Sequence, residues 1–203
     1  MQKTILVFDL DNTLILRDQA MLDCIEEVFN IQLNSEQKKV IEEKDQQGHS
    51  DRMEFSKWLK TCLDLNLPID LIWEKIKNNI GYFVQLNQNA NEVLRQLQKH
   101  YELVLLTNGG TENQKRKIQQ TGLYQFFPSD RIFISEKLGF SKPDSEAFQI
   151  VQNQFPLAQQ FIMIGDHYEK DILGAKNFGW EAIYLNPKKD LNQILHELRH
   201  QHE

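Results

Sequence analysis

Short apolar runs recur along two parts of this chain. The first, TILVF at 4–8, is a continuous apolar run rich in β-forming residues, which is typical of a strand buried on both faces. Acidic positions follow it at once. Four similar runs follow at 102–107, 131–135, 160–165 and 181–186. Because segments with helical spacing separate the later runs, the pattern predicts β–α–β units. We therefore expect an α/β fold with a doubly wound, Rossmann-like parallel sheet.

The segment 16–86 interrupts this alternation with one helical pattern after another. Its apolar residues recur at helical spacing, for example at Met21, Cys24, Ile25, Val28 and Phe29. Asn34 and Pro68 stand where two of these helices would begin. The sequence thus predicts an inserted all-α domain at 16–86. An α/β core domain would be formed from 1–15 and 87–203.

Composition narrows the function classes. The chain has 203 residues, of which 40% are hydrophobic, and a formal net charge of −6, which argues against a nucleic-acid partner. No stretch approaches the ~20 apolar residues of a membrane span, so we expect no membrane partner and a cytoplasmic protein. Cys24 and Cys62 both lie in apolar-periodic surroundings and are expected to be core residues, neither bridged nor nucleophilic.

Two carboxylates, Asp9 and Asp11, follow the first apolar run. Residues two apart on an extended backbone point the same way, so both would project from the carboxyl end of a buried strand. Open α/β sheets bind their ligands at that end. The alternative is that one aspartate caps a helix and the other is merely exposed.

Three later segments favour a shared site. In LLTNGG, Thr107 and Asn108 end a predicted strand, where a hydroxyl and backbone N–H groups suit a phosphate oxygen, although an ordinary strand-to-helix turn would look similar. In GFSKPD, Lys142 precedes Pro143, which we place as the first residue of a helix, so that this lysine can reach inward; a solvated lysine is the usual alternative. In MIGDHYEKD, Asp166 repeats the position of Asp9 at a strand tip.

Asp171 follows Asp166 at the start of a helical pattern. Neighbouring parallel strands would bring these carboxylates together, without cysteine or a histidine pair nearby. Such a cluster of oxygen ligands describes a hard-cation site, for which Mg²⁺ fits best. One lysine would offset part of the remaining negative charge.

Taken together, these segments resemble the haloacid dehalogenase (HAD) superfamily. Its D-x-D-x-T motif stands here as Asp9-Leu-Asp11-Asn-Thr13, and its later motifs match the strand-end threonine, the lysine and the G-D segment with a further aspartate. The four motifs occur in the family's order, and the resemblance covers about 1–15 and 87–203. The inserted helices are similar to the family's α-helical cap. Asp11 is absent from dehalogenases proper, so the chain looks like a phosphatase.

This resemblance implies a mechanism and residue roles. Asp9 would be the phosphorylated nucleophile, and Asp11 the general acid and then the general base. The Mg²⁺ ligands would be Asp9, Asp166 and the backbone carbonyl of Asp11. Asp171 would hold metal-bound water. The groups that bind the phosphoryl oxygens would be Thr107, the Asn108 backbone and Lys142.

Substrate choice would fall to the helical insertion. By analogy with capped relatives, the loop 45–52 places His49 or Arg52 against the leaving group; an ordinary polar turn is an equal alternative. We expect a phosphomonoesterase acting on a small phosphorylated metabolite. A phosphomutase of the same superfamily and a phospho-acceptor signalling domain are the alternatives. The sequence does not identify the substrate or the oligomeric state.

Overall fold

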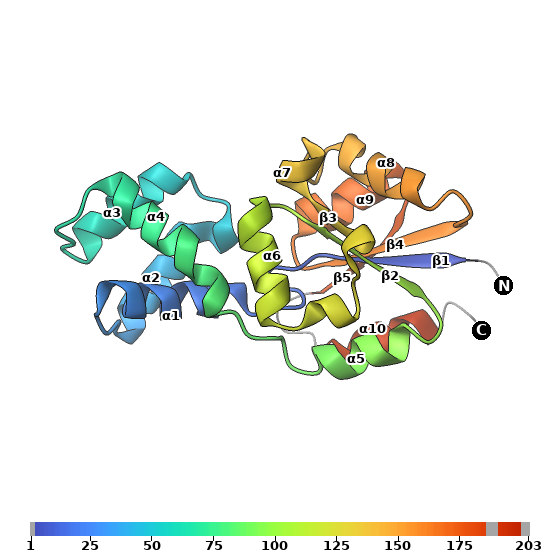
Figure 1. The fold of residues 1–203 in the computed structure, drawn as a ribbon, viewed down its shortest axis with the longest axis horizontal. Coiled ribbons are helices and arrows are strands. Elements are labelled where there is room, and N and C mark those ends of the chain that lie inside the picture. Colours follow the sequence, from blue (N-terminus) through green and yellow to red (C-terminus); the bar gives the residue numbers. More distant parts are fainter. Residues whose placement is uncertain (1–2, 186–190, 200–203) are drawn as a thin grey trace. The chain divides into compact units, whose positions relative to one another are not determined.

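A five-stranded parallel sheet forms the centre of the α/β part of the chain. The computed structural model describes residues 3–185 and 191–199. The strand order is β3-β2-β1-β4-β5, and every neighbouring pair is parallel, which confirms the expected doubly wound sheet (Figure 1). The strands are β1 (Thr4–Phe8), β2 (Glu102–Thr107), β3 (Ile132–Ile134), β4 (Gln160–Gly165) and β5 (Glu181–Tyr184).

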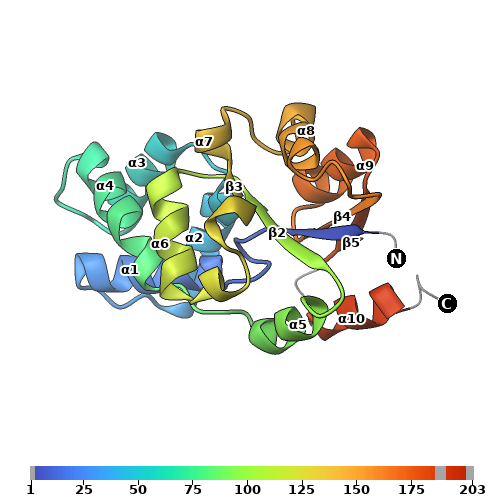
Figure 2. The same ribbon diagram turned by 45° about the vertical axis from the view of Figure 1, so that its right-hand side comes forward.

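Helices cover both faces of this sheet. α8 and α9 lie on one side, and α5 and α10 on the other (Figures 1 and 2). Alternate side chains of the strands, such as Val7, Val104 and Met163, pack under Phe148 of α8 and against Trp180. Burial on both faces explains why the strands read as continuous apolar runs. The helices of this part are α5 (Ala90–Leu97), α6 (Thr111–Gln120), α7 (Ser135–Leu138), α8 (Ser145–Gln154), α9 (Gly174–Phe178) and α10 (Asn192–Arg199).

Two local expectations were wrong. α8 begins at Ser145, so Pro143 is not its first residue. A turn precedes the helix instead, in which the Asp144 N–H donates to the Ser141 carbonyl at 2.7 Å. The helical pattern that begins at Asp171 is not one helix: a π-helix spans Tyr168–Leu173, and α9 follows it. Extra backbone in a π-turn is common at functional sites.

The inserted segment folds as a separate helical unit. The chain divides into two compact units, one formed by Met1–Ile15 with Leu86–Glu203 and the other by Leu16–Gln85. The helices of the second unit are α1 (Arg17–Phe29), α2 (Ser35–Asp45), α3 (Arg52–Cys62) and α4 (Ile69–Asn79). Asn34 caps α2 in a reciprocal arrangement with Gln37.

The two cysteines differ in their surroundings. Cys24 is buried, as expected, whereas Cys62 is exposed at the end of α3, so its assignment to the core was wrong. Cys62 is the last residue of α3, and the buried face of this helix stops at Leu59, which the periodicity alone did not reveal. In the part of the chain that the structure describes, no helix is long and apolar enough to span a bilayer.

Candidate active site

The carboxyl ends of β1 and β4 position the first two carboxylates. Phe8 and Ile164 are in register, and the Asp9 N–H donates to the Ile164 carbonyl at 2.9 Å. Asp166 directly follows β4. Its backbone N–H donates to the Thr13 hydroxyl, which in turn donates to the Asp166 carboxylate, both at 3.1 Å. The threonine of the first motif therefore fixes an aspartate of the last.

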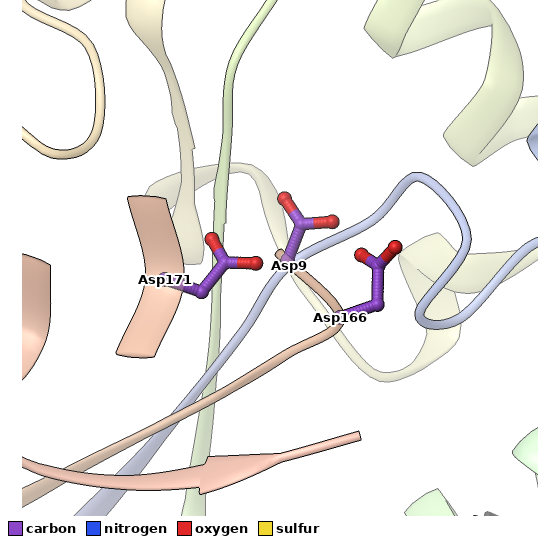
Figure 3. Close-up of side chains that lie close together, drawn as sticks. All are labelled: Asp9, Asp166 and Asp171. Atoms are coloured by element: carbon purple, nitrogen blue, oxygen red, sulfur yellow. The ribbon is translucent and has the colours of Figure 1, made fainter. Parts of the chain in front are cut away.

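Asp171 supplies a third carboxylate from the π-helix. One carboxylate oxygen from each of Asp9, Asp166 and Asp171 lies within 4.8 Å of the others, and the three side chains converge in Figure 3. The His167 N–H donates to Asp171 at 3.0 Å. Gly165 makes room for this arrangement, because a methyl group at that position would overlap the Asp171 carboxylate.

Lys142 faces this cluster from the segment before α8. Its Nζ lies 2.6 Å from Asp9 Oδ1 and 2.6 Å from Asp171 Oδ1, and the residue is only 2% exposed. The alternative of a solvated lysine is therefore wrong. Three carboxylates facing one ammonium give this cluster a surplus of negative charge. Oxygen donors with such a surplus suit a divalent hard cation such as Mg²⁺.

Burial and repulsion between carboxylates raise the pKa values of two aspartates in the cluster. Burial raises the pKa of Asp9 to about 7, with Lys142 opposing the shift and Asp171 and Asp11 adding to it. Burial, Asp9 and Asp171 together raise the pKa of Asp166 to about 8. Burial by itself lowers the pKa of Lys142, but Asp171 and Asp9 outweigh that effect and the net change is upward. Without a cation, the cluster therefore resists full ionisation, and a bound cation would favour its ionised form.

The predicted phosphate-binding residues lie at the end of β2. Thr107 is the last residue of the strand and is fully buried. The Asn108 side chain holds the Lys142 backbone in both directions: its amide donates to the Lys142 carbonyl at 2.8 Å, and its oxygen accepts from the Lys142 N–H at 3.0 Å. The strand end and the lysine segment are therefore joined by direct hydrogen bonds.

The Asp11 side chain pairs with residues that the sequence reasoning missed. Lys117 Nζ lies 2.7 and 2.8 Å from its two oxygens, and Gln114 Nε2 donates to Oδ2 at 3.0 Å. Both partners come from α6 and are nearly fully buried. The sequence held one signal for these residues. Gln114 lies four positions before Ile118, the one apolar residue of this helix, so the two share a helix face. Lys117 lies three positions after Gln114 and is therefore its neighbour on the helix surface.

The two candidate specificity residues belong to the helical unit. His49 is exposed, in the turn between α2 and α3. Arg52 donates to the buried Asp45 at 2.8 Å and lies 5.3 Å from the centre of the Trp73 ring. Arg17 also pairs with Asp45. These contacts hold the loop 45–52 in place within its own unit.

Comparison with known proteins shows the family to which this chain belongs. The sequence profile of the haloacid dehalogenase-like hydrolases matches residues 6–185. The chain belongs to this family. As a haloacid dehalogenase-like hydrolase, it shares 32% identity over 134 residues with the pyrimidine 5'-nucleotidase YjjG of Escherichia coli, covering 65% of this chain and 57% of YjjG. It shares 27% identity over 196 residues with a glyceraldehyde 3-phosphate phosphatase of Pyrococcus abyssi, covering 89% and 80% of the two chains.

The fold of this haloacid dehalogenase-like hydrolase also matches a solved structure. The magnesium-bound HAD-hydrolase YfnB from Bacillus subtilis superimposes with a TM-score of 0.80 at 25% identity, over 98% of this chain and 100% of that one. In the sequence comparison, the chain spans 50% of the length of YfnB and 46% of a pyrimidine 5'-nucleotidase from Streptococcus pneumoniae, so it covers about half of these relatives.

Proposed function

We propose that this chain is a Mg²⁺-dependent phosphatase that hydrolyses small phosphate monoesters through an aspartyl-phosphate on Asp9. One observation carries the proposal: three buried carboxylates and one buried lysine meet at the carboxyl end of a parallel sheet, beside Thr107 and Asp11. Ligands of open α/β sheets bind at this edge. A phosphate ester with a divalent cation matches both the lysine and the excess negative charge.

In the first step, an Asp9 carboxylate oxygen attacks the phosphorus, and the bond from phosphorus to the leaving oxygen breaks. Asp11 donates a proton to that oxygen, so that an alcohol departs. Proton transfer of this kind typically contributes ~10²–10⁴-fold to a rate. The Thr107 hydroxyl, the Asn108 backbone N–H and the Lys142 ammonium stabilise the charge that spreads over the phosphoryl oxygens.

In the second step, water attacks the phosphorus of the aspartyl-phosphate. Asp11, now ionised, accepts a proton from that water, and the bond between phosphorus and the Asp9 oxygen breaks to release inorganic phosphate. The same carboxyl group thus returns to its starting protonation state. This exchange of roles is what a single acid–base residue must do in a two-step hydrolysis.

The residues fit a magnesium ion. The side chains of Asp9 and Asp166 and the backbone carbonyl of Asp11 would hold it, with Asp171 binding its water. When bound, Mg²⁺ supplies positive charge that screens the incoming phosphate from the carboxylates. The magnesium-bound state of the similar YfnB supports this assignment.

Similar proteins support small phosphorylated substrates of more than one kind. YjjG is named as a pyrimidine 5'-nucleotidase, and the Pyrococcus abyssi protein as a glyceraldehyde 3-phosphate phosphatase. A panel of nucleoside monophosphates and sugar or triose phosphates therefore comes first in a substrate screen. The cap role of the helical unit, substrate contacts from His49 and Arg52, and a cytoplasmic location stay predictions.

The test measures hydrolysis of p-nitrophenyl phosphate with Mg²⁺ and with EDTA. We expect turnover that requires Mg²⁺ and is abolished in Asp9→Asn. Asp130→Asn is the matched control, because it removes a carboxylate that is largely exposed. Its activity should equal that of the wild type.

Other outcomes separate the alternatives. Stoichiometric phosphorylation without turnover would indicate a phospho-acceptor domain. Conversion of a sugar phosphate with little release of inorganic phosphate would indicate a phosphomutase. Turnover that persists in Asp9→Asn would exclude this residue as the nucleophile.

A further inference from the structure

We propose that Lys117 and Gln114 are positioning residues that set the orientation of Asp11 and Thr107; this inference rests on the proposed phosphatase function. Lys117 lies 106 positions from Asp11 in the sequence, yet its Nζ contacts both carboxylate oxygens, at 2.7 and 2.8 Å. The lysine is 3% exposed. A buried cation that spans both oxygens of one carboxylate leaves that group little rotational freedom.

The ion pair between Lys117 and Asp11 lies in the proposed active site, so we expect it to affect catalysis as well as stability. Lys142 already faces Asp9 and Asp171, so the site holds two buried lysines with separate tasks. Lys142 faces the nucleophile, whereas Lys117 contacts the proposed acid–base residue. The two lysines come from different segments of the α/β unit and contact different carboxylates.

Gln114 connects the acid–base residue to the phosphate-binding threonine. Its Nε2 lies 3.0 Å from Asp11 Oδ2 and 2.6 Å from Thr107 Oγ1. An amide nitrogen only donates, so the Thr107 hydroxyl accepts this hydrogen bond and its own hydrogen is directed elsewhere. We infer that this hydrogen is donated to a phosphoryl oxygen of the substrate.

The loop before α6 is built around the Gln114 side chain. Gly109 has a φ of +141°, and a Cβ at this position would lie 3.1 Å from Gln114 Cδ and 3.2 Å from Cγ. Glycine therefore serves two needs here: a backbone conformation that other residues rarely adopt, and space for the glutamine. The TNGG turn and α6 together hold Gln114 in the position from which it contacts Asp11 and Thr107.

The expected effect is a loss of rate more than of binding. Misplacement of a reacting group by about 1 Å costs on the order of 10²-fold in rate. For Lys117→Met we therefore expect kcat to fall about 100-fold while KM changes by less than about 3-fold. The loss in kcat/KM should be larger for an alkyl phosphate, whose alkoxide needs a proton to leave, than for p-nitrophenyl phosphate.

Variants on the same helix provide controls. Lys115→Met removes an exposed lysine that pairs with Glu112, and its activity should match the wild type. Lys117→Arg keeps the charge and should recover part of the lost rate. Gln114→Met removes only the amide and should give a smaller loss than Lys117→Met. Unfolding midpoints of all variants show whether each one folds.

The decisive measurement is a double-mutant cycle with Asp11→Asn. If Lys117 acts through Asp11, Lys117→Met should cost little further activity towards p-nitrophenyl phosphate once Asp11 is already replaced. Equal losses in both backgrounds, or Lys117→Met behaving like Lys115→Met, would overturn the positioning role while the phosphatase assignment stands. A wild-type protein with no phosphatase activity would instead remove the proposed function and, with it, the basis of this inference.

Discussion

Without Mg²⁺, the stability of the α/β unit should fall as pH rises, and Mg²⁺ should offset part of this loss. The ordinary pKa of an aspartate is 3.8, whereas burial and neighbouring carboxylates raise the values of Asp9 and Asp166 to about 7 and about 8. Between about pH 4 and pH 8 the folded protein therefore binds more protons at these groups than the unfolded chain does. Stability must then decrease with increasing pH across this window.

The size of this loss in the free energy of unfolding follows from the pKa values of Asp9 and Asp166. The difference between 3.8 and about 7 corresponds to about 4 kcal/mol for Asp9 alone, and that between 3.8 and about 8 to about 6 kcal/mol for Asp166. The charge of Asp9 is itself one cause of the raised pKa of Asp166, so the two figures are not added. We expect the metal-free protein to lose about 4–6 kcal/mol between pH 4 and pH 8. A domain has only about 5–15 kcal/mol in total.

The assay is urea unfolding at pH 5 and at pH 8.5, with EDTA or with Mg²⁺. Trp180 is buried in the α/β unit, so its fluorescence reports on this unit when Trp58 and Trp73 are replaced by phenylalanine. Mg²⁺ at 100 times its dissociation constant should add about 2.7 kcal/mol at pH 8.5. Protons compete for the same oxygens, so the metal should add less at pH 5.

Asp166→Asn gives a sharp control. Asparagine keeps an oxygen for the Thr13 hydroxyl but carries no charge, so the variant should be more stable than the wild type in EDTA at pH 8.5. It should also lose most of its response to Mg²⁺. A metal-free wild type whose stability stays level or rises from pH 5 to pH 8.5 would refute the reasoning, as would an Asp166→Asn variant that is less stable than the wild type at pH 8.5.

Two further predictions concern the local packing. Gly165→Ala should displace the Asp171 carboxylate and weaken Mg²⁺ binding by about 10–100-fold, as measured by calorimetric titration. At the exposed Gly139 a Cβ meets nothing within 4 Å but φ is +78°, so Gly139→Ala should lower stability through backbone strain and leave Mg²⁺ affinity unchanged. Asp45→Asn should destabilise the helical unit by about 3–5 kcal/mol in urea unfolding, because Arg17 and Arg52 would lose a buried counter-charge; a change below about 1 kcal/mol would mean that solvent already screens the cluster.

Local pattern in the sequence was enough for the sheet and for half of the site. Continuous apolar runs predicted parallel strands, because only strands covered on both faces lack polar alternation. Asp9 and Asp166 each follow such a run, and the carboxyl ends of neighbouring parallel strands share one edge. Their approach was therefore predictable without coordinates. The same reasoning placed Asp171 and Lys142 at this cluster, and the HAD resemblance gave them their roles.

The remainder was decided by tertiary structure. Lys117 and Gln114 sit in a helix with one apolar residue, which by itself reads as a solvated element. The crossover between β2 and β3 places their side chains over Asp11, and this contact helps to compensate for the burial of the Lys117 ammonium. Periodicity reports which face of an element is apolar, but it does not report which distant charge will meet a buried one. Pairing between segments about a hundred residues apart depends on the assembled fold.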